Sequence, residues 1–387
     1  MKVAEDSFSK LKKKIIVYSK LIGIDKIGFT TGEPFTEVIP VLEEHKLKGF
    51  ASGLEAKDIR LRIDPNLSLP GVKSIISIAV AYPNQIDYRA DDQEPRGMFA
   101  RVSWGKDYHV VLREKLMLLA AYLRTLVPEC RTCLMVDTGP LSDRAVARRA
   151  GLGWIGRNGS LITREFGSFV YLGELLTDLP LEADCFTAEG CGECRRCIAA
   201  CPAQAIQGNS LIDCQKCLAF QTINKGSLTD ETKEKIAENT YIYGCDACQL
   251  ACPFNKDKKN DWHQEFRAEY CLLNPSLKDL LQVSNKEFTR RYGSFSGSWR
   301  GKKVLQRNAL FILGSLQDKK NLLILQTILQ EDLRPDIRAA AAWAVGKHDS
   351  PEACRILELS LQKEQEPLVS KEIKKALTKQ QRFKTSH

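Results

Sequence analysis

The sequence predicts a chain of three parts: a mixed α/β domain over residues 1–180, a cysteine-rich region over 181–260 and an all-α domain over 261–387. Three observations predict this division. Strand and helix patterns alternate along the first part, ten of the 14 cysteines lie in the second, and the third carries helical patterns only. A chain of 387 residues is long enough for two or three domains.

The elements of the first part follow from hydrophobic periodicity and from residues that end helices and strands. Apolar residues three and four apart predict helices over 7–23 and 107–127. A shorter helix begins at Ser142, a possible N-cap, and ends before Gly151. Strands are expected where apolar runs are short, and these runs are 24–30, 74–82 (ended by Pro83), 133–136 and 169–176. This alternation is typical of an α/β domain.

The second part carries the most specific motif in the chain. The spacing C-x2-C-x2-C-x3-C-P is formed by Cys191, Cys194, Cys197, Cys201 and Pro202, and a shorter copy is formed by Cys245, Cys248, Cys252 and Pro253. This is the cysteine spacing of bacterial-type ferredoxins, in which soft thiolates bind iron. The region is therefore predicted to be ferredoxin-like, with two 4Fe-4S clusters that carry one-electron chemistry.

The spacing also predicts which cysteines share a cluster. In such runs the first three cysteines bind one cluster, and the cysteine before proline binds the other. The predicted ligands of the first cluster are Cys191, Cys194, Cys197 and Cys252, and those of the second are Cys201, Cys245, Cys248 and either Cys214 or Cys217. We favour Cys217, because it opens an apolar run, whereas Cys214 follows Asp213 in a polar turn.

Zinc and disulfide bonds are the alternative uses of these cysteines. The run is poor spacing for a zinc site, which usually combines two separated pairs of ligands. Disulfides need an oxidising compartment, and the N-terminal sequence MKVAEDSFSKLKKK has no apolar signal core. No apolar stretch approaches the length of a membrane span. We therefore expect a soluble, cytoplasmic protein, and nothing in the sequence requires an oligomer.

The third part contains two related helical units. RNALFILGSL and IRAAAAWAVGKH lie about thirty residues apart, and each has an Arg near its start and a Gly near its end. This repetition predicts a HEAT-like domain, with a plain helical bundle as the alternative. About +8 of the formal charge of +9 falls in residues 291–387, so an anionic partner is expected there unless the charge only solvates the surface.

Four stretches of the chain resemble the epoxyqueuosine reductase family. They are RVSWGKDYHVVLREKL (101–116), VDTGPLSDRAVARRAGLGWIGRNGSLI (136–162), GSFVYLGELLTDL (167–179) and the paired cluster runs CGECRRCIAACP and YGCDACQLACPFNK. The second stretch and the cluster runs together are highly specific, and the resemblance covers nearly the whole chain. The cluster runs alone would fit many enzymes that contain a ferredoxin-like domain.

The resemblance implies a cobalamin-dependent enzyme that acts on tRNA. The family reduces epoxyqueuosine at the wobble position to queuosine, which is the last step of queuosine biosynthesis. Cobalamin would bind the N-terminal α/β domain, and the clusters would pass it electrons from an external donor of the flavodoxin or ferredoxin type. Asp137 matches the proposed proton donor, and burial against a corrin would raise its pKa. The alternative role for Asp137 is a turn residue before Pro140.

The resemblance also suggests contacts to the corrin, its nucleotide tail or the substrate. The residues proposed for these contacts are Arg60, Arg101, Tyr108, His109, Trp154, Asn158, Leu161 and Ser168. His109 is a possible cobalt ligand, but the D-x-H-x-x-G motif that often supplies one is absent, and a structural or substrate role fits as well. The glycines of GLGWIG follow a helix, which is the wrong context for a dinucleotide fingerprint. They could allow close approach to the corrin, or simply end the helix.

Cations of the third part are the expected tRNA contacts. They are Arg300, Lys302, Lys303 and Arg307, with Lys374 and Lys375 as further members, and Trp299 could stack on a base or belong to the core. Two other functions remain open at this stage. A reductive dehalogenase for small organohalides would use the same cofactors but needs no basic helical domain. An electron carrier would not need the long α/β region.

Overall fold

A computed structural model describes residues 2–85, 94–188 and 190–384, without the side chains of 2–7 and 381–384. The chain forms two compact units built from interleaved segments. Residues 1–86, 101–217 and 246–267 form unit 1, and residues 87–100, 218–245 and 268–387 form unit 2. The cysteine-rich region is divided between the two units, and the predicted boundaries at 180 and 260 stay predictions.

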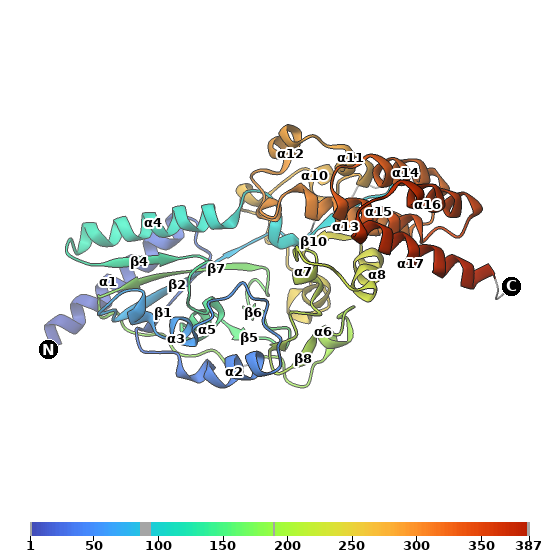
Figure 1. The fold of residues 1–387 in the computed structure, drawn as a ribbon. Helices are drawn as coiled ribbons and strands as arrows, with labels where there is room; N and C mark the ends of the chain where they lie inside the picture. The colour runs from blue at the N-terminus through green and yellow to red at the C-terminus, as the bar shows by residue number, and fades with distance from the viewer. Residues whose placement is uncertain (1, 86–93, 189, 385–387) are drawn as a thin grey trace. The chain divides into compact units, whose positions relative to one another are not determined.

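Unit 1 is built on a four-stranded sheet in the order β1-β2-β7-β4 (Figure 1). The strands are β1 (Lys26–Thr31), β2 (Ser74–Ala81), β4 (Thr132–Met135) and β7 (Val170–Thr177), each within two residues of its predicted bounds. All three pairings are antiparallel. The predicted mixture of helices and strands is confirmed, but the parallel crossovers common in α/β domains do not occur in this sheet.

Helices α1 (Lys2–Leu21) and α4 (Tyr108–Leu126) cover one face of the sheet (Figure 1). Ile15 of α1 and Leu112 of α4 are fully buried with Ile76 of β2 and Leu175 of β7 in one apolar cluster. Burial of such side chains contributes about 1.5–3 kcal/mol each relative to exposure. This face therefore holds the main core of unit 1.

Helix α5 (Asp143–Arg149) covers the opposite face. Val146 packs with Ile75 and Leu176, and Ala147 packs with Ala79 in a second cluster. Every second side chain on a strand points to the same face of the sheet. The residue between Ile75 and Ala79 on β2 that shares their face, and its partner on β7, therefore also lie beneath α5. Those residues are Ser77 and Glu174, which pair across the two strands. A polar row thus interrupts an otherwise apolar layer.

Shorter elements complete unit 1. They are η1 (Thr36–Val38), α2 (Ile39–Leu47), α3 (Ile59–Ile63), η2 (Pro65–Leu67), η3 (Arg101–Ser103), β5 (Trp154–Ile155), β6 (Leu161–Ile162), α6 (Arg196–Ala199), β8 (Ile206–Gly208), β9 (Leu211–Ile212), α9 (Ala247–Leu250), η4 (Pro253–Asn255) and η5 (Gln264–Phe266). Gly153 stands between α5 and β5, and a Cβ there would lie 2.1 Å from the carbonyl oxygen of Ile162. This glycine lets β5 pair with β6.

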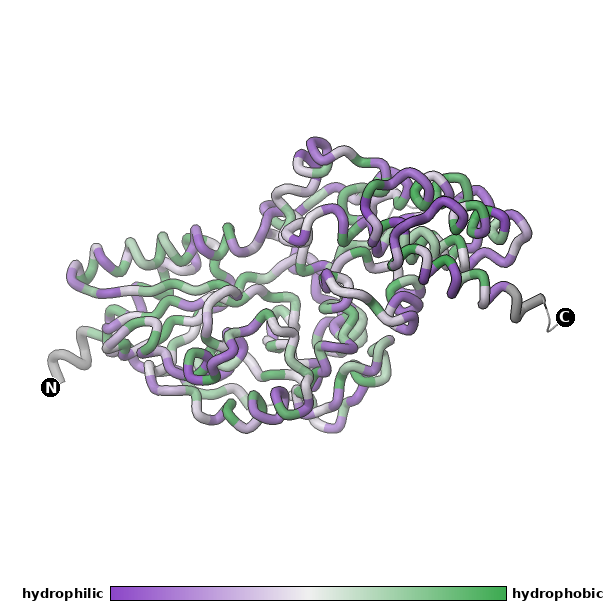
Figure 2. Tube along the Cα trace, in the orientation of Figure 1, coloured by the Kyte–Doolittle hydropathy of each residue, from purple (hydrophilic) through white to green (hydrophobic). Residues whose placement is uncertain are grey.

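Unit 2 is almost entirely helical. Its elements are β3 (Met98–Phe99), α7 (Leu218–Gln221), α8 (Asp230–Asn239), β10 (Tyr241–Tyr243), α10 (Tyr270–Leu273), α11 (Leu277–Gln282), α12 (Asn285–Tyr292), η6 (Ser296–Ser298), α13 (Lys302–Ser315), η7 (Lys319–Asn321), α14 (Leu322–Glu331), α15 (Pro335–Val345), α16 (Pro351–Lys363) and α17 (Pro367–Lys384). The alternation of hydrophobic and hydrophilic residues along these helices can be followed in Figure 2.

The helical repeat is visible in how the helices of unit 2 touch. A Cβ on Gly314 of α13 would lie 2.6 Å from Ala344 Cα of α15, and one on Gly346 would lie 2.5 Å from Ala376 Cβ of α17. The same small-residue contact therefore recurs one repeat further along the chain. This confirms the predicted repeats and adds α17 to them. Among the described residues, no helix is long and apolar enough to cross a membrane.

Candidate active site and cluster region

Asp137 lies in the loop that follows β4. Its φ of 52° is in the left-handed region, which few residues other than glycine adopt. Its side chain is 58% exposed, and one carboxylate oxygen, Oδ2, lies 3.3 Å from His109 Nε2. The sheet thus presents this acid at the surface in a backbone conformation that its neighbours must hold in place.

The first turn of α4 supplies the partners of Asp137. Asp107 caps the helix by accepting the backbone N–H of His109, and its Oδ1 lies 2.7 Å from His109 Nδ1. Tyr108 also donates a hydrogen bond to the Asp137 carboxylate. The structure therefore brings together three residues predicted for the site, Asp137, Tyr108 and His109, and adds Asp107.

The hydrogen bonds decide the charges at this site. The bond from His109 lowers the pKa of Asp137, against the effect of partial burial. Partial burial alone would lower the pKa of His109, but its bonds to Asp107 and Asp137 raise it to about 9. His109 is then an imidazolium at neutral pH and Asp137 a carboxylate. From the sequence we expect burial against a corrin to raise the pKa of Asp137. In the protein without a corrin, the hydrogen bond from His109 lowers this pKa more than partial burial raises it.

Two further carboxyl groups lie next to this loop, and sequence reasoning missed both. Asp143 accepts the backbone N–H of Asp137, and burial, followed by the charge of Asp137, raises its pKa to about 7. Glu174 is fully buried, and neither of its carboxylate oxygens has a hydrogen-bond partner among the described residues. Burial, and then the charge of Asp143, raises the pKa of Glu174 well above its usual value. The sequence did contain a signal for Glu174, because it is the acidic residue within the apolar strand predicted over 169–176.

The structure gathers the four cysteines predicted for the first cluster. Cys191 and Cys252 pack in one apolar cluster with Trp154, Ile162 and Phe254. Burial raises the pKa of the Cys252 thiol, and the neighbouring thiols of Cys191, Cys197 and Cys194 raise it further. These sulfurs therefore lie close enough to influence one another, as ligands of one cluster must.

The cysteines predicted for the second cluster fall in both units. Cys201, Cys217 and Cys248 belong to unit 1, and Cys245 belongs to unit 2. Cys201 Sγ accepts the backbone N–H of Ala205. Cys214 is also nearby in the chain: burial, followed by Cys217, raises its pKa to about 11, and its Sγ lies 3.9 Å from His45 Nε2. The choice between Cys214 and Cys217 stays a prediction.

The predicted corrin contacts have different environments. Trp154 and Asn158 are buried, and their side-chain N–H groups, Trp154 Nε1 and Asn158 Nδ2, have no hydrogen-bond acceptor among the described residues. Leu161 is buried in the cluster that contains Ala147. Ser168 Oγ accepts bonds from Gln249 and Asn255. Trp154 and Asn158 therefore carry buried side-chain N–H groups that no acceptor among the described residues uses.

The two predicted arginines also differ. Arg101 is held by ion pairing of its guanidinium with the buried Asp246 at 3.0 Å, and by a bond from its Nε to the Asn84 carbonyl. Arg60 is 81% exposed and pairs with Asp58 two residues earlier. Arg101 therefore anchors the segment before α9, whereas Arg60 is accessible from solvent.

The cations predicted to contact tRNA lie in unit 2. The Arg300 guanidinium stacks 3.9 Å from the centre of the Trp299 ring, and this tryptophan is 54% exposed. Lys302 donates to the Val283 carbonyl, and Lys303 pairs with Asp336. Trp299 and Arg300 thus form a stacked pair in which the indole is exposed, while the two lysines already have partners.

The prediction for Arg307 does not fit the structure. Its side chain is buried in unit 2 and donates to the carbonyls of Asn224 and Gln221 and to the Asn308 side chain. Burial lowers the pKa of Arg307 to about 10. A guanidinium enclosed in this way cannot reach an RNA backbone, so Arg307 is a structural residue of the first repeat.

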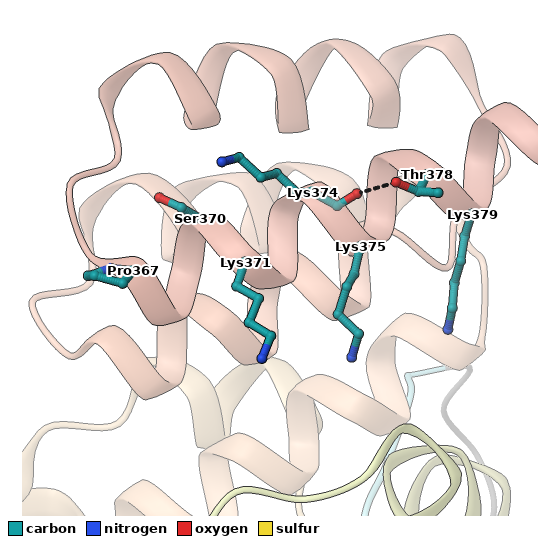
Figure 3. A pocket seen from close by; sticks show the side chains of 7 residues that line it. All are labelled: Pro367, Ser370, Lys371, Lys374, Lys375, Thr378 and Lys379. Carbon is teal, nitrogen blue, oxygen red and sulfur yellow. Dashed lines mark hydrogen bonds between the residues drawn. The ribbon is translucent and has the colours of Figure 1, made fainter.

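Helix α17 presents a basic surface, of which only Lys374 and Lys375 are predicted from the sequence (Figure 3). A groove of about 650 Å³ runs along it, lined by Pro367, Ser370, Lys371, Lys374, Lys375, Thr378 and Lys379. Lys371, Lys375 and Lys379 are four residues apart and project from the same side of the helix in Figure 3. Lys375 also pairs with Asp230 at 3.0 Å. Lys379 pairs with the same Asp230 at 3.7 Å, so Lys371 and Lys374 are the lysines of this groove that have no ion pair among the described residues.

The fold and the site define a class of protein: an iron–sulfur oxidoreductase with an acid–imidazole pair on its α/β unit and helical repeats in its second unit. Known families agree with each part. "Epoxyqueuosine reductase QueG, DUF1730" matches residues 62–138, "4Fe-4S double cluster binding domain" matches 190–255, and "HEAT repeats" matches 301–378.

Whole-length relatives identify the family. Epoxyqueuosine reductase of Bacillus subtilis is 45% identical over 370 residues, 95% of each chain, and that of Staphylococcus aureus is 45% identical over 340 residues, 87% of this chain and 89% of the relative. A crystal structure of epoxyqueuosine reductase with an epoxyqueuosine-modified tRNA-Tyr stem loop has a TM-score of 0.93 at 44% identity, covering 97% of this chain and all of the other.

The chain therefore belongs to the epoxyqueuosine reductase family, which consists of oxidoreductases that act on tRNA. Its cofactors include the two 4Fe-4S clusters of the matched cluster domain. This membership favours tRNA modification over the dehalogenation of small organohalides. Another solved structure, of epoxyqueuosine reductase from Bacillus subtilis, has a TM-score of 0.92 at 44% identity over 96% of this chain and 99% of the other. In that structure the catalytic aspartate loop is swung out of the active site.

Proposed function

We propose that this protein reduces epoxyqueuosine in tRNA to queuosine and that Asp137 delivers the proton to the departing oxygen. The observation that carries this assignment is the bond between Asp137 Oδ2 and His109 Nε2, which places a proton at an exposed carboxylate. General acid catalysis of this kind typically contributes a factor of about 10² to 10⁴ in rate.

The stoichiometry shows what the site must supply. Conversion of an epoxide to an alkene breaks both C–O bonds, consumes two electrons and two protons, and releases one water. The matched cluster domain carries one-electron carriers, which suit the stepwise delivery of those electrons. The acid–imidazole pair suits the delivery of a proton. The ligands we assign to the clusters are Cys191, Cys194, Cys197 and Cys252 for one, and Cys201, Cys217, Cys245 and Cys248 for the other.

Cobalamin is the group that would accept those electrons and supply a strongly reducing metal centre at the epoxide. The β5–β6 segment fits such a group in its donor chemistry. Trp154 Nε1 and Asn158 Nδ2 are unused N–H donors, and the amide side chains of a corrin offer carbonyl acceptors. Burying such donors without partners costs about 1–3 kcal/mol each, which a bound acceptor would offset. We assign Trp154 and Asn158 to this contact, with Arg60 as a solvent-accessible cation for the nucleotide tail.

Two surfaces of unit 2 are suited to tRNA. The Trp299–Arg300 pair can stack on an unpaired base, because the exposed Trp299 indole offers an aromatic surface and Arg300 places a cation beside it. The lysines of α17 can neutralise backbone phosphates. Lys302 and Lys303 would contribute only after leaving their partners Val283 and Asp336. We expect the protein to act in the cytoplasm with a flavodoxin or ferredoxin as electron donor.

The test is an anaerobic reaction of the cluster-loaded full chain with cobalamin, a reductant and tRNA that carries epoxyqueuosine. Mass analysis of the digested nucleosides measures conversion. Queuosine should form only when cobalamin is present. A protein that binds cobalamin and tRNA but forms no queuosine would contradict the proposed activity.

Two single cysteine variants test the assignment of the cluster ligands. Cys252→Ser should lose about half of the bound iron and sulfide, because it removes a ligand of one cluster only. Cys354→Ser, in α16 of unit 2, should keep all of it. Equal iron content in the two variants would contradict the ligand set.

A further inference from the structure

The imidazole of His109 lies between two carboxylates. Its Nδ1 is 2.7 Å from Asp107 Oδ1, and its Nε2 is 3.3 Å from Asp137 Oδ2. Each ring nitrogen therefore faces an acceptor, and only the imidazolium can donate to both at once. The side chain is about 30% exposed, so the charge is only partly screened by water.

Aromatic contacts hold the ring in this position. Tyr108 stacks on His109 with centroids 4.1 Å apart, and on Tyr171 of β7 with centroids 4.5 Å apart and nearly parallel planes. The Tyr171 hydroxyl in turn donates to the Val102 carbonyl. Together with the cap bond from Asp107, this stack fixes the imidazole relative to the sheet and to the Asp137 loop.

The charges around the pair favour a proton on His109 over one on Asp137. From α4, Asp107 and Tyr108 face the pair, and Asp107 stabilises the imidazolium. From α5, Arg144 stabilises the Asp137 carboxylate. Asp143 accepts the Asp137 amide from the same helix. The raised pKa of His109 and the lowered pKa of Asp137 agree with this arrangement.

We propose that His109 is the resting holder of the proton that Asp137 donates, so that the acid of the reaction is the His109–Asp137 pair. The proposal rests on the reduction of epoxyqueuosine proposed above. The proton leaves His109 Nε2, passes to Asp137 Oδ2 and reaches the oxygen as its C–O bond breaks. His109 is left neutral and Asp137 is left as a carboxylate.

The step balances with the rest of the reaction. The low-potential electron donor supplies two electrons through the clusters, and the second proton comes from solvent, so that the oxygen leaves as water. His109 then regains its proton from solvent before the next turnover. The role assigned to His109 is distinct from ligation of cobalt, because both of its nitrogens are used by carboxylates.

The first test observes the proton directly in the cluster-loaded full chain without substrate. The protein has five histidines, and NMR of ring-labelled histidine with His109→Gln for assignment would follow each one. His109 should titrate near pH 9, and its midpoint should fall in Asp137→Asn and in Asp107→Asn, since each removes an anionic partner. A midpoint near 6.5 that neither variant moves would overturn the proposal.

The second test uses single turnover with tRNA bound. His109→Ala should slow queuosine formation by roughly 10²-fold while tRNA affinity changes little. Added imidazole should restore rate in proportion to imidazolium, which a purely structural role would not produce. Wild-type rate should fall as pH rises past about 9, and Asp107→Asn should move this fall to lower pH while keeping the imidazole in place.

A matched control is Lys106→Gln, which removes a neighbouring cation that pairs with Glu114 and not with Asp137. It should leave rate and pH profile unchanged. A folded His109→Ala protein with wild-type rate would overturn the proposal, as would an Asp107→Asn profile identical to wild type. The absence of queuosine from the wild type would instead overturn the proposed function, while the titration would still report on the pair.

Discussion

The loop after β4 and the layer beneath α5 hold the same chemical group in opposite states. Asp137 is exposed and accepts bonds from His109 and Tyr108, which lower its pKa. Glu174 pairs with Met135, two residues before Asp137, yet it is fully buried without a partner, and its pKa is raised. The charge of each carboxyl group is therefore determined by its burial and its hydrogen-bond donors, and not by where the residue stands in the sequence.

The comparison explains how one small region can hold a reactive acid. An unpartnered carboxylate beneath α5 would be too costly to keep ionised, so Glu174 stays neutral and adds no negative charge beside the loop. Asp137 can then be governed by His109 on its exposed side. The predictions below test the two states in turn.

Asp137→Asn should have the largest effect. It removes the group that carries the proton while keeping its size, so the single-turnover rate of queuosine formation should fall by about 10² to 10⁴-fold. Binding of tRNA and cobalamin should be unchanged. Asp178→Asn is the matched control, because Asp178 is also an acid with a cationic partner, Arg131, and should keep full rate. Equal rates in the two variants would contradict the role of Asp137.

Glu174→Gln should change how stability depends on pH. The raised pKa of Glu174 means that the unfolded state ionises first as pH rises above about 4.5, so the wild type loses stability with rising pH. The variant should lack this loss, which is at most about 1.4 kcal/mol per pH unit. Urea midpoints of the two proteins at several pH values measure the difference.

Glu165→Gln provides the control for that prediction. Burial alone would raise the pKa of Glu165, but its bonds to Lys26 and to a backbone N–H, together with nearby lysine charges, lower it. Its contribution to stability is therefore present above pH 4.5 and is lost as pH falls. The two variants should therefore differ from wild type with opposite pH trends. Parallel trends would show that Glu174 is not held neutral.

The sequence predicted much of the fold but little of this charge pattern. Hydrophobic runs and Pro83 located the sheet strands to within two residues. Their antiparallel order could not be read from the chain, because pairing depends on contacts between distant segments. Asp137, Tyr108 and His109 were identified through the family motif. Glu174 was missed, because its state depends on burial beneath α5.

The error at Arg307 has a similar cause. Every residue of α13 from Val304 to Gly314 is buried, so this helix has no solvent-facing side over that range. A sequence pattern assigns a cation to the surface by default, whereas Arg307 is used to bind carbonyls of Gln221 and Asn224. Arg338, which is the arginine at the start of the second helical repeat, likewise pairs with Glu364. Both are structural residues of the repeats.

Asp143→Ala should have a smaller effect on rate. It removes the acceptor of the Asp137 backbone N–H, and one such bond is worth about 1 kcal/mol, or about fivefold in the population of the placed loop. Asp143→Asn keeps an acceptor and should stay near wild type. Steady-state rates of the two variants make the comparison, and a slow Asn variant with a normal Ala variant would contradict it.

The smallest expected effect concerns salt. Replacing Lys371 or Lys374 by Ala should reduce the slope of log affinity against log salt by roughly 0.7 to 0.9 per lysine, since each neutralises about one phosphate. Lys48→Ala, a lysine of unit 1 already paired with Glu44, should leave the slope unchanged. Fluorescence anisotropy with a labelled tRNA stem loop at several salt concentrations measures it.

Infrared spectroscopy tests the central claim most directly, because protonated carboxyl groups absorb apart from carboxylates. Because Asp143, with a pKa of about 7, would add a second band, the spectra are compared in an Asp143→Asn background. At neutral pH the substrate-free protein should then contain a carboxylic acid band that Glu174→Gln removes and Asp137→Asn leaves in place. That result would place the proton on Glu174 and leave Asp137 charged beside His109. A band removed by Asp137→Asn would show that Asp137 carries its own proton, and would contradict the His109–Asp137 pair as the acid of the reaction.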